Sequence, residues 1–102
     1  MDTLEKILAQ DLEADRPTLA MFYSAADPRC VQELPVMRKA AKLHGGEAHY
    51  FEVDVDQYPD LKEKYHIHAY PTFILFSDGQ QAWRAEGRLP ESELADMVHR
   101  FA

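Results

Sequence analysis

Cysteine is nearly absent from this sequence: Cys30 is the single cysteine among 102 residues. One cysteine cannot form an intramolecular disulfide, which excludes a disulfide-stapled scaffold and makes a reducing cytoplasm the expected compartment. Runs of about 18 apolar residues are also missing, so neither a transmembrane helix nor a membrane partner is expected. The N-terminus is acidic rather than basic and then apolar, which predicts that there is no secretory leader.

Basic residues are scarce as well. Eleven Lys and Arg face 18 Asp and Glu, giving a formal net charge of -7. Nucleic-acid backbones are bound by clustered Lys and Arg, and because no such cluster is present, nucleic acid is not an expected partner. The remaining composition, 46% hydrophobic and 28% charged, is ordinary for a globular protein. The length predicts one domain, residues 1–102, with a single modest core.

The first elements can be read from apolar spacing and from helix-breaking residues. A short amphipathic helix ending at Pro17 is predicted by four apolar residues at helical spacing, which are Leu4, Ile7, Leu8 and Leu12. Residues 18–24 are apolar and bounded by breakers, which is typical of a buried central strand.

A longer helix is predicted to begin at Asp27 and Pro28. Aspartate is a favoured N-cap, and proline is favoured at the first helical position because its missing N–H costs nothing there. Pro35 is expected to kink this helix, and residues 44–46 to close it. Its expected apolar face consists of Cys30, Leu34, Met37 and Ala41.

The second half of the chain predicts a helix between strands, then a hairpin, then a final helix. Residues 48–55 form the second expected strand, 56–65 a short helix, and 67–71 an extended connection. The hairpin strands are expected at 72–76 and 80–86, joined by Asp78-Gly79 and closed by Gly87. A final amphipathic helix carries Leu94, Met97, Val98 and Phe101. The expected fold class is α/β, with a central mixed four-stranded sheet flanked by helices on both faces.

Several motifs together resemble the thioredoxin family over about nine-tenths of the chain. The apolar strand at 19–23 runs into Asp27-Pro28-Arg29-Cys30, with a proline one turn later. Residues 53–59 resemble the family's strand-to-helix segment. Residues 65–72 resemble the segment that ends in a cis-proline, here Tyr70-Pro71. The resemblance implies a thioredoxin fold over the whole domain.

The resemblance also implies altered chemistry. The first cysteine of the family's Cys-x-x-Cys falls at Asp27, and the tryptophan before it at Ala26. Pro28 and Arg29 occupy the two positions between the cysteines. The family's buried strand aspartate falls at Met21 and its partner lysine at Glu52. Two-cysteine disulfide reductase activity is therefore not expected.

Asp27 and Cys30 each allow two interpretations. Asp27 is either an N-cap or a carboxylate that tunes Cys30, and it cannot replace an attacking thiolate. Cys30 is either a packed small side chain or a lone thiol that forms mixed disulfides with glutathione or a partner thiol. For that thiol, the helix N-terminus and Arg29 would lower the pKa, whereas burial and Asp27 would raise it. Glu52 is a candidate proton acceptor behind Cys30.

Two functions follow from these alternatives. The first is a protein-binding or chaperone-like module that holds an extended segment of a client protein. Its expected contact surface consists of Ala26, Asp27, Pro28, Arg29, Tyr70, Pro71, Gly87 and Arg88. The second is a monothiol oxidoreductase in cell redox homeostasis, in which Cys30 is catalytic. No cofactor is expected, and no metal, because His66 and His68 lack an obvious third ligand.

Overall fold

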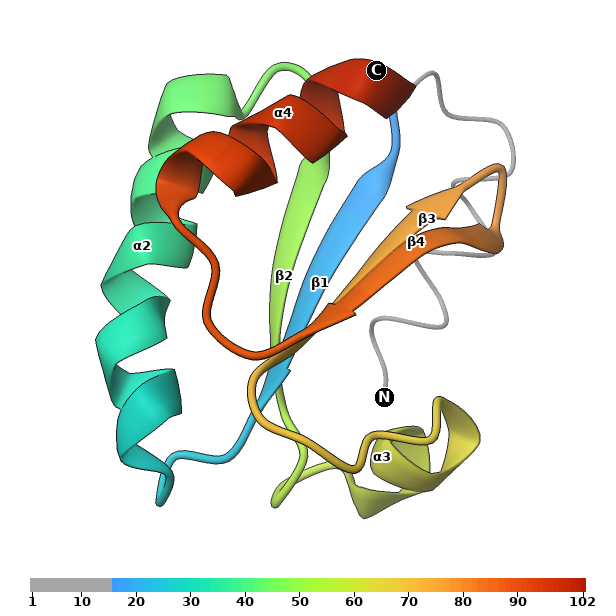
Figure 1. The fold of residues 1–102 in the computed structure, drawn as a ribbon. Helices are drawn as coiled ribbons and strands as arrows, with labels where there is room; N and C mark the ends of the chain where they lie inside the picture. Colours follow the sequence, from blue (N-terminus) through green and yellow to red (C-terminus); the bar gives the residue numbers. More distant parts are fainter. Residues whose placement is uncertain (1–15) are drawn as a thin grey trace.

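The computed structural model describes residues 16–102. In chain order the elements are β1 (Thr18–Tyr23), α2 (Pro28–His44), β2 (His49–Asp54), α3 (Pro59–Lys64), β3 (Thr72–Ser77), β4 (Gln80–Glu86) and α4 (Glu91–Phe101), as Figure 1 shows. The predicted helix that contains Leu4, Ile7, Leu8 and Leu12 lies outside the described residues. The other predicted helices and strands are present, with ends shifted by a few residues.

The four strands form one mixed sheet in the order β2-β1-β3-β4. β1 pairs parallel to β2 and antiparallel to β3, and β3 pairs antiparallel to β4. The helix α2 connects the parallel strands β1 and β2, as such a crossover requires. A tight turn connects the antiparallel strands β3 and β4. The predicted mixed four-stranded sheet is therefore confirmed.

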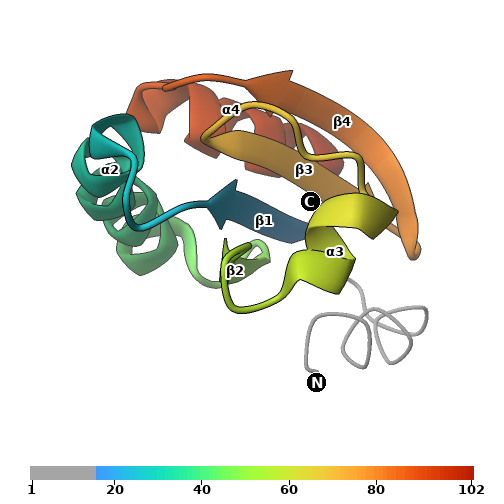
Figure 2. The same ribbon diagram turned by 90° about the horizontal axis from the view of Figure 1, so that it is seen from below.

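Both faces of the sheet are buried because the central strands are apolar on both sides. β1 and β3 alternate their side chains between two hydrophobic clusters. One cluster lies under α2 and α4 and contains Leu19, Met21, Met37, Ala40, Ala48, Phe73, Leu75, Leu94 and Val98. The other lies on the α3 face and contains Ala20, Phe22, Val53, Val55, Leu61, Tyr65, Ile67, Ile74 and Phe76. Figure 2 shows α2 and α4 on one side of the sheet and α3 on the other.

The hairpin turn has the geometry that its sequence predicts. Asp78 and Gly79 have φ angles of 55° and 78°. Positive φ at both central residues defines the turn type that matches the twist of a two-residue hairpin, and the Asp-Gly pair favours it. A register shift at Leu75/Phe76 lets β4 bend over the sheet, and Trp83 packs half-buried against the cluster under α2 and α4.

The buried face of α2 differs from the predicted one. Cys30 and Met37 are buried as expected, and Leu34 packs partly buried against the cluster under α2 and α4, but the other fully buried positions are Glu33 and Ala40. The buried stripe is thus displaced around the helix toward Glu33, whose charge is neutralised within the protein as described below. Within residues 16–102, no helix has the length and apolarity that crossing a bilayer requires.

Candidate functional site

The site is built first on the start of α2, where Asp27 caps the helix. Asp27 has extended backbone angles, and its Oδ1 accepts a hydrogen bond of 2.8 Å from the backbone N–H of Arg29. Pro28 follows at the first helical position. This arrangement satisfies a helix donor that would otherwise lack a partner. The N-cap interpretation of Asp27 is confirmed.

Asp27 also forms an ion pair with the side chain of Arg29. The guanidinium Nη2 lies 2.8 Å from Oδ2 of Asp27, and Nε lies 3.2 Å from Oδ1. These hydrogen bonds, with the one from the Arg29 backbone, hold the pKa of the Asp27 carboxyl below its usual range. The Arg29 side chain is 63% exposed and that of Asp27 only 16%. The pair therefore presents its positive end to solvent.

Cys30 lies beneath this surface and is fully buried. Burial is the largest influence on its thiol and raises the pKa, because a thiolate loses hydration there. The backbone of Ser24 opposes this effect by donating a hydrogen bond, and Asp27 reinforces it by charge repulsion. Burial thus has a larger effect on the pKa of Cys30 than the nearby Arg29 charge that would lower it. The thiol is therefore protonated and covered at neutral pH.

A second loop completes the site opposite the start of α2. The peptide bond between Tyr70 and Pro71 is cis. The N–H of Gly87 donates a 2.8 Å hydrogen bond to the carbonyl of Pro71, and Gly87 has a φ of 94°, a conformation that glycine adopts readily. Within residues 16–102, the backbone N–H and C=O of Tyr70 have no hydrogen-bond partner. These groups remain available to pair with another chain.

The two loops border one open surface depression. Its lining consists of Ser24, Ala26, Asp27, Pro28, Arg29 and Tyr70. Five of these residues were predicted from sequence. Pro71 and Gly87 were also predicted but do not line the depression; Pro71 is buried, and Gly87 bonds to its carbonyl. Ser24 was missed. Its hydroxyl donates a 2.7 Å hydrogen bond to Asp56 and so ties the segment before α2 to the segment after β2.

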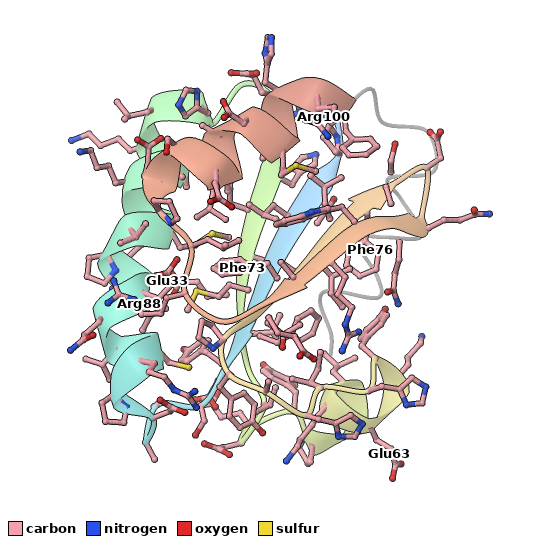
Figure 3. All side chains as sticks on the ribbon, viewed as in Figure 1. Glu33, Glu63, Phe73, Phe76, Arg88 and Arg100 are labelled. Atoms are coloured by element: carbon pink, nitrogen blue, oxygen red, sulfur yellow. The ribbon has the colours of Figure 1, made fainter. Side chains whose placement is uncertain are left out.

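Arg88 is not in this depression. Its Nε lies 3.0 Å from Oε1 of Glu33, and its Nη1 donates to Gln32 at 2.9 Å, so its guanidinium rests on the second turn of α2. The backbone N–H of Leu89 donates to the other oxygen of Glu33 at 3.2 Å. Figure 3 shows Glu33 on α2 and Arg88 on the segment before α4, facing one another.

Glu33 lies next to the site and was not predicted from the sequence. It is fully buried, and its carboxylate fixes the segment that follows Gly87 to α2. The signal was present in the sequence, since Glu33 is three positions after Cys30 and four before Met37. Both spacings put it on the buried stripe of the helix, where a charge needs a partner.

Comparison with known proteins identifies the family. The sequence model described as Thioredoxin matches residues 2–100. The chain belongs to the thioredoxin family. Its relatives include Thioredoxin Y2, chloroplastic, of Arabidopsis thaliana, 34% identical over 85 residues that make up 83% of this chain and 51% of that protein. Thioredoxin of Rhodospirillum rubrum is 30% identical over 87 residues, 85% of this chain and 84% of that protein.

Solved thioredoxins have the same fold. Fasciola hepatica thioredoxin superposes with a TM-score of 0.86 at 28% identity, covering 97% of this chain and 91% of that one. Reduced Schistosoma mansoni thioredoxin pre-protein superposes with a TM-score of 0.85 at 25% identity, covering 97% and 90%. The thioredoxin fold predicted from sequence is thereby confirmed. The chain spans about half the length of the chloroplastic thioredoxins named Y that it matches.

The two positions at which the family's buried aspartate and its partner lysine fall are Met21 and Glu52, and both make other contacts here. Met21 is fully buried in β1 and packs in the cluster under α2 and α4. Glu52 pairs with Met21 in the sheet register, but its carboxylate is held by Arg38 through bonds of 2.7 and 2.9 Å. The suggestion that Glu52 takes a proton from Cys30 therefore has no support in these contacts.

His66 and His68 lie on the connection that leads to Tyr70. Their ring centroids are 6.4 Å apart. In the described part of the chain, no group of three or more His, Cys, Asp or Glu side chains is placed to hold a metal ion. Arg84 fixes the same connection by donating to the carbonyls of Tyr65 and His66 at 2.7 and 2.6 Å.

Proposed function

We propose that this thioredoxin-family chain is a protein-binding or chaperone-like module that holds an extended client segment without turning over disulfides. The site is the depression bordered by the start of α2 and the Tyr70-Pro71 loop. We also propose a reducing cytoplasm as its compartment, in keeping with its single cysteine.

One observation carries this proposal: the surface position at the start of α2 is a carboxylate, and the single thiol is buried behind it. Disulfide exchange requires a thiolate that can reach the disulfide sulfur. Cys30 is fully buried and its pKa is raised by that burial, so both access and ionisation are unfavourable. Asp27 cannot substitute, because a carboxylate does not carry a disulfide.

The binding role rests on the Tyr70 backbone. An unpaired N–H and C=O beside an open depression are the groups that an added strand uses to bind, with side-chain contacts giving selectivity. Ala26 and Pro28 supply the apolar part of the lining and Tyr70 the aromatic part. An extended peptide can therefore gain hydrogen bonds and apolar contact at the same place.

The test has a chemical arm and a binding arm. In an insulin-reduction assay, we expect no turnover above that of dithiothreitol alone, and turnover comparable to a two-cysteine thioredoxin would overturn the proposal. In the binding arm, fluorescence anisotropy follows a labelled short peptide of alternating valine and glutamine, which can add a strand. We expect saturable binding, whereas a Kd weaker than about 1 mM would contradict the binding role.

Two neighbouring alanines provide a matched pair of variants. Ala26 and Ala25 are both exposed, but only Ala26 lines the depression. Ala26→Gln is expected to weaken peptide binding several-fold because it fills the depression, whereas Ala25→Gln is expected to leave it unchanged. Equal effects of the two changes would place the peptide elsewhere on the protein.

The monothiol oxidoreductase is the competing function, and alkylation of Cys30 separates the two. We expect negligible labelling by iodoacetamide until the protein is unfolded. Fast labelling of the folded protein, with an apparent pKa below the free-thiol value of about 8.5, would instead support mixed-disulfide chemistry with glutathione.

A further inference from the structure

We infer that the client segment held at this site is acidic, and that a client carboxylate binds between Arg29 and Arg88. This inference rests on the proposed binding function and specifies its partner. It comes from the way that the charges of two ion pairs are layered on the first two turns of α2, of which the first borders the depression.

Both pairs turn the carboxylate inward and the guanidinium outward. Asp27 is 16% exposed beneath Arg29, which is 63% exposed. Glu33 is fully buried beneath Arg88, which is 44% exposed. Each pair is neutral as a whole, yet the charge that an approaching molecule meets first is positive. This contrasts with the net charge of -7 of the whole chain.

Arg29 is on the first turn of α2, and the guanidinium of Arg88 rests on the second turn. Arg88 bonds to Gln32 and Glu33, which are three and four positions after Arg29. Residues at these spacings are neighbours on a helix surface, about 5–6 Å apart at Cβ. Gln32, the side chain between the two groups, is uncharged. A single anionic group can therefore approach both arginines.

Each arginine keeps donors for that anion. Arg29 uses Nε and Nη2 on Asp27, and Arg88 uses Nε and Nη1 on Glu33 and Gln32. Within residues 16–102, Nη1 of Arg29 and Nη2 of Arg88 have no acceptor. Guanidinium groups bind carboxylates through such paired donors.

Charges across the depression do not cancel this pattern. Asp56 is exposed there, but its carboxylate accepts from the Ser24 hydroxyl and interacts with Lys62. The Lys62 ammonium in turn lies 5.6 Å from the centre of the Tyr70 ring. The charge of Asp56 is therefore met by the Ser24 hydroxyl and by Lys62, and the α2 side presents the two guanidinium groups.

The experiment compares three labelled peptides that alternate valine with glutamate, glutamine or lysine. At low salt we expect the glutamate peptide to bind about five- to tenfold more tightly than the glutamine peptide, and the lysine peptide to bind most weakly. The ratio of glutamate-peptide to glutamine-peptide affinity is expected to fall toward one at about 1 M NaCl, where the screening length is about 3 Å.

Variants test whether Arg29 and Arg88 produce the preference for the glutamate peptide. Arg29→Gln and the double change E33Q/R88Q are each expected to reduce the ratio of glutamate-peptide to glutamine-peptide affinity at least threefold. The double change avoids leaving Glu33 buried without its partner. Circular dichroism verifies that each variant is folded.

Arg38→Gln is the matched control. Arg38 is 62% exposed and also forms a two-bond pair, with Glu52, but it lies nine positions after Arg29 and hence on the opposite side of the helix. This variant should retain the full preference for glutamate.

The outcomes distinguish this inference from the proposed function. Equal affinity for the glutamate and glutamine peptides, or a preference that survives both Arg29→Gln and E33Q/R88Q, would overturn the acidic client while leaving the binding module intact. Failure of all three peptides to bind would overturn the binding function itself.

Discussion

The Glu33–Arg88 pair provides the sharpest test of how the site is held together. Glu33 accepts one bond from Arg88 and one from the Leu89 backbone, and its side chain is fully buried. Arg88→Gln removes the compensating charge and leaves the carboxylate inside the protein. Removing one partner of a buried ion pair costs about 3–5 kcal/mol.

The expected cost for this pair is smaller than that range. Arg88 is 44% exposed, so water can reach the space that its guanidinium leaves, and the Leu89 N–H continues to donate. We therefore expect Arg88→Gln to lower the free energy of unfolding by about 2–3 kcal/mol. At about 4–8 °C per kcal/mol for a domain of this size, Tm should fall by roughly 10–20 °C.

Urea denaturation of a double-mutant cycle measures this cost. E33Q/R88Q removes both charges but keeps amides that can form hydrogen bonds, so it is expected to recover more than half of the loss caused by Arg88→Gln. Arg38→Gln, which breaks a pair on the exposed face of α2, should have a much smaller effect. If Arg88→Gln and Arg38→Gln prove equally mild, the ion pair between Arg88 and buried Glu33 contributes little to stability, and our account of how the segment after Gly87 is fixed is wrong.

Three further predictions concern Asp27 and Cys30. Because burial raises the folded-state pKa of the Cys30 thiol, its stabilising contribution is complete below about pH 8.5 and is lost as pH rises through the folded pKa. Urea titrations from about pH 7.5 to 9.5 should show this loss in the native sequence and not in Cys30→Ala. Asp27→Cys should form a disulfide with Cys30 on oxidation, and an intact mass without the loss of two hydrogens would refute our alignment of this segment. Asp27→Asn keeps the cap but loses the ion pair with Arg29. Because the Asp27 pKa is lowered in the folded protein, the native sequence should have a higher Tm than Asp27→Asn above about pH 3.9. This difference in Tm should vanish as pH falls through the folded pKa.

Local sequence was sufficient for most elements because their signals depend on neighbouring residues. Asp27-Pro28 marks the start of α2 through capping and proline geometry, and Asp78-Gly79 marks the hairpin through its positive φ angles. The apolar runs of β1 and β3 predict strands buried on both faces. The sequence also determined by itself that the chain has one thiol and a carboxylate three positions before it.

Tertiary structure decided what those two residues can do. The helix dipole and Arg29 favour a reactive Cys30, and burial opposes it; only packing of the helix against the sheet shows that burial is the stronger effect. The spacing of Glu33 from Cys30 and Met37 puts it on the buried stripe of α2, but its partner is 55 residues away in sequence. A charged residue becomes a core residue only when the fold brings a compensating charge to it, and no local pattern in the sequence specifies that meeting.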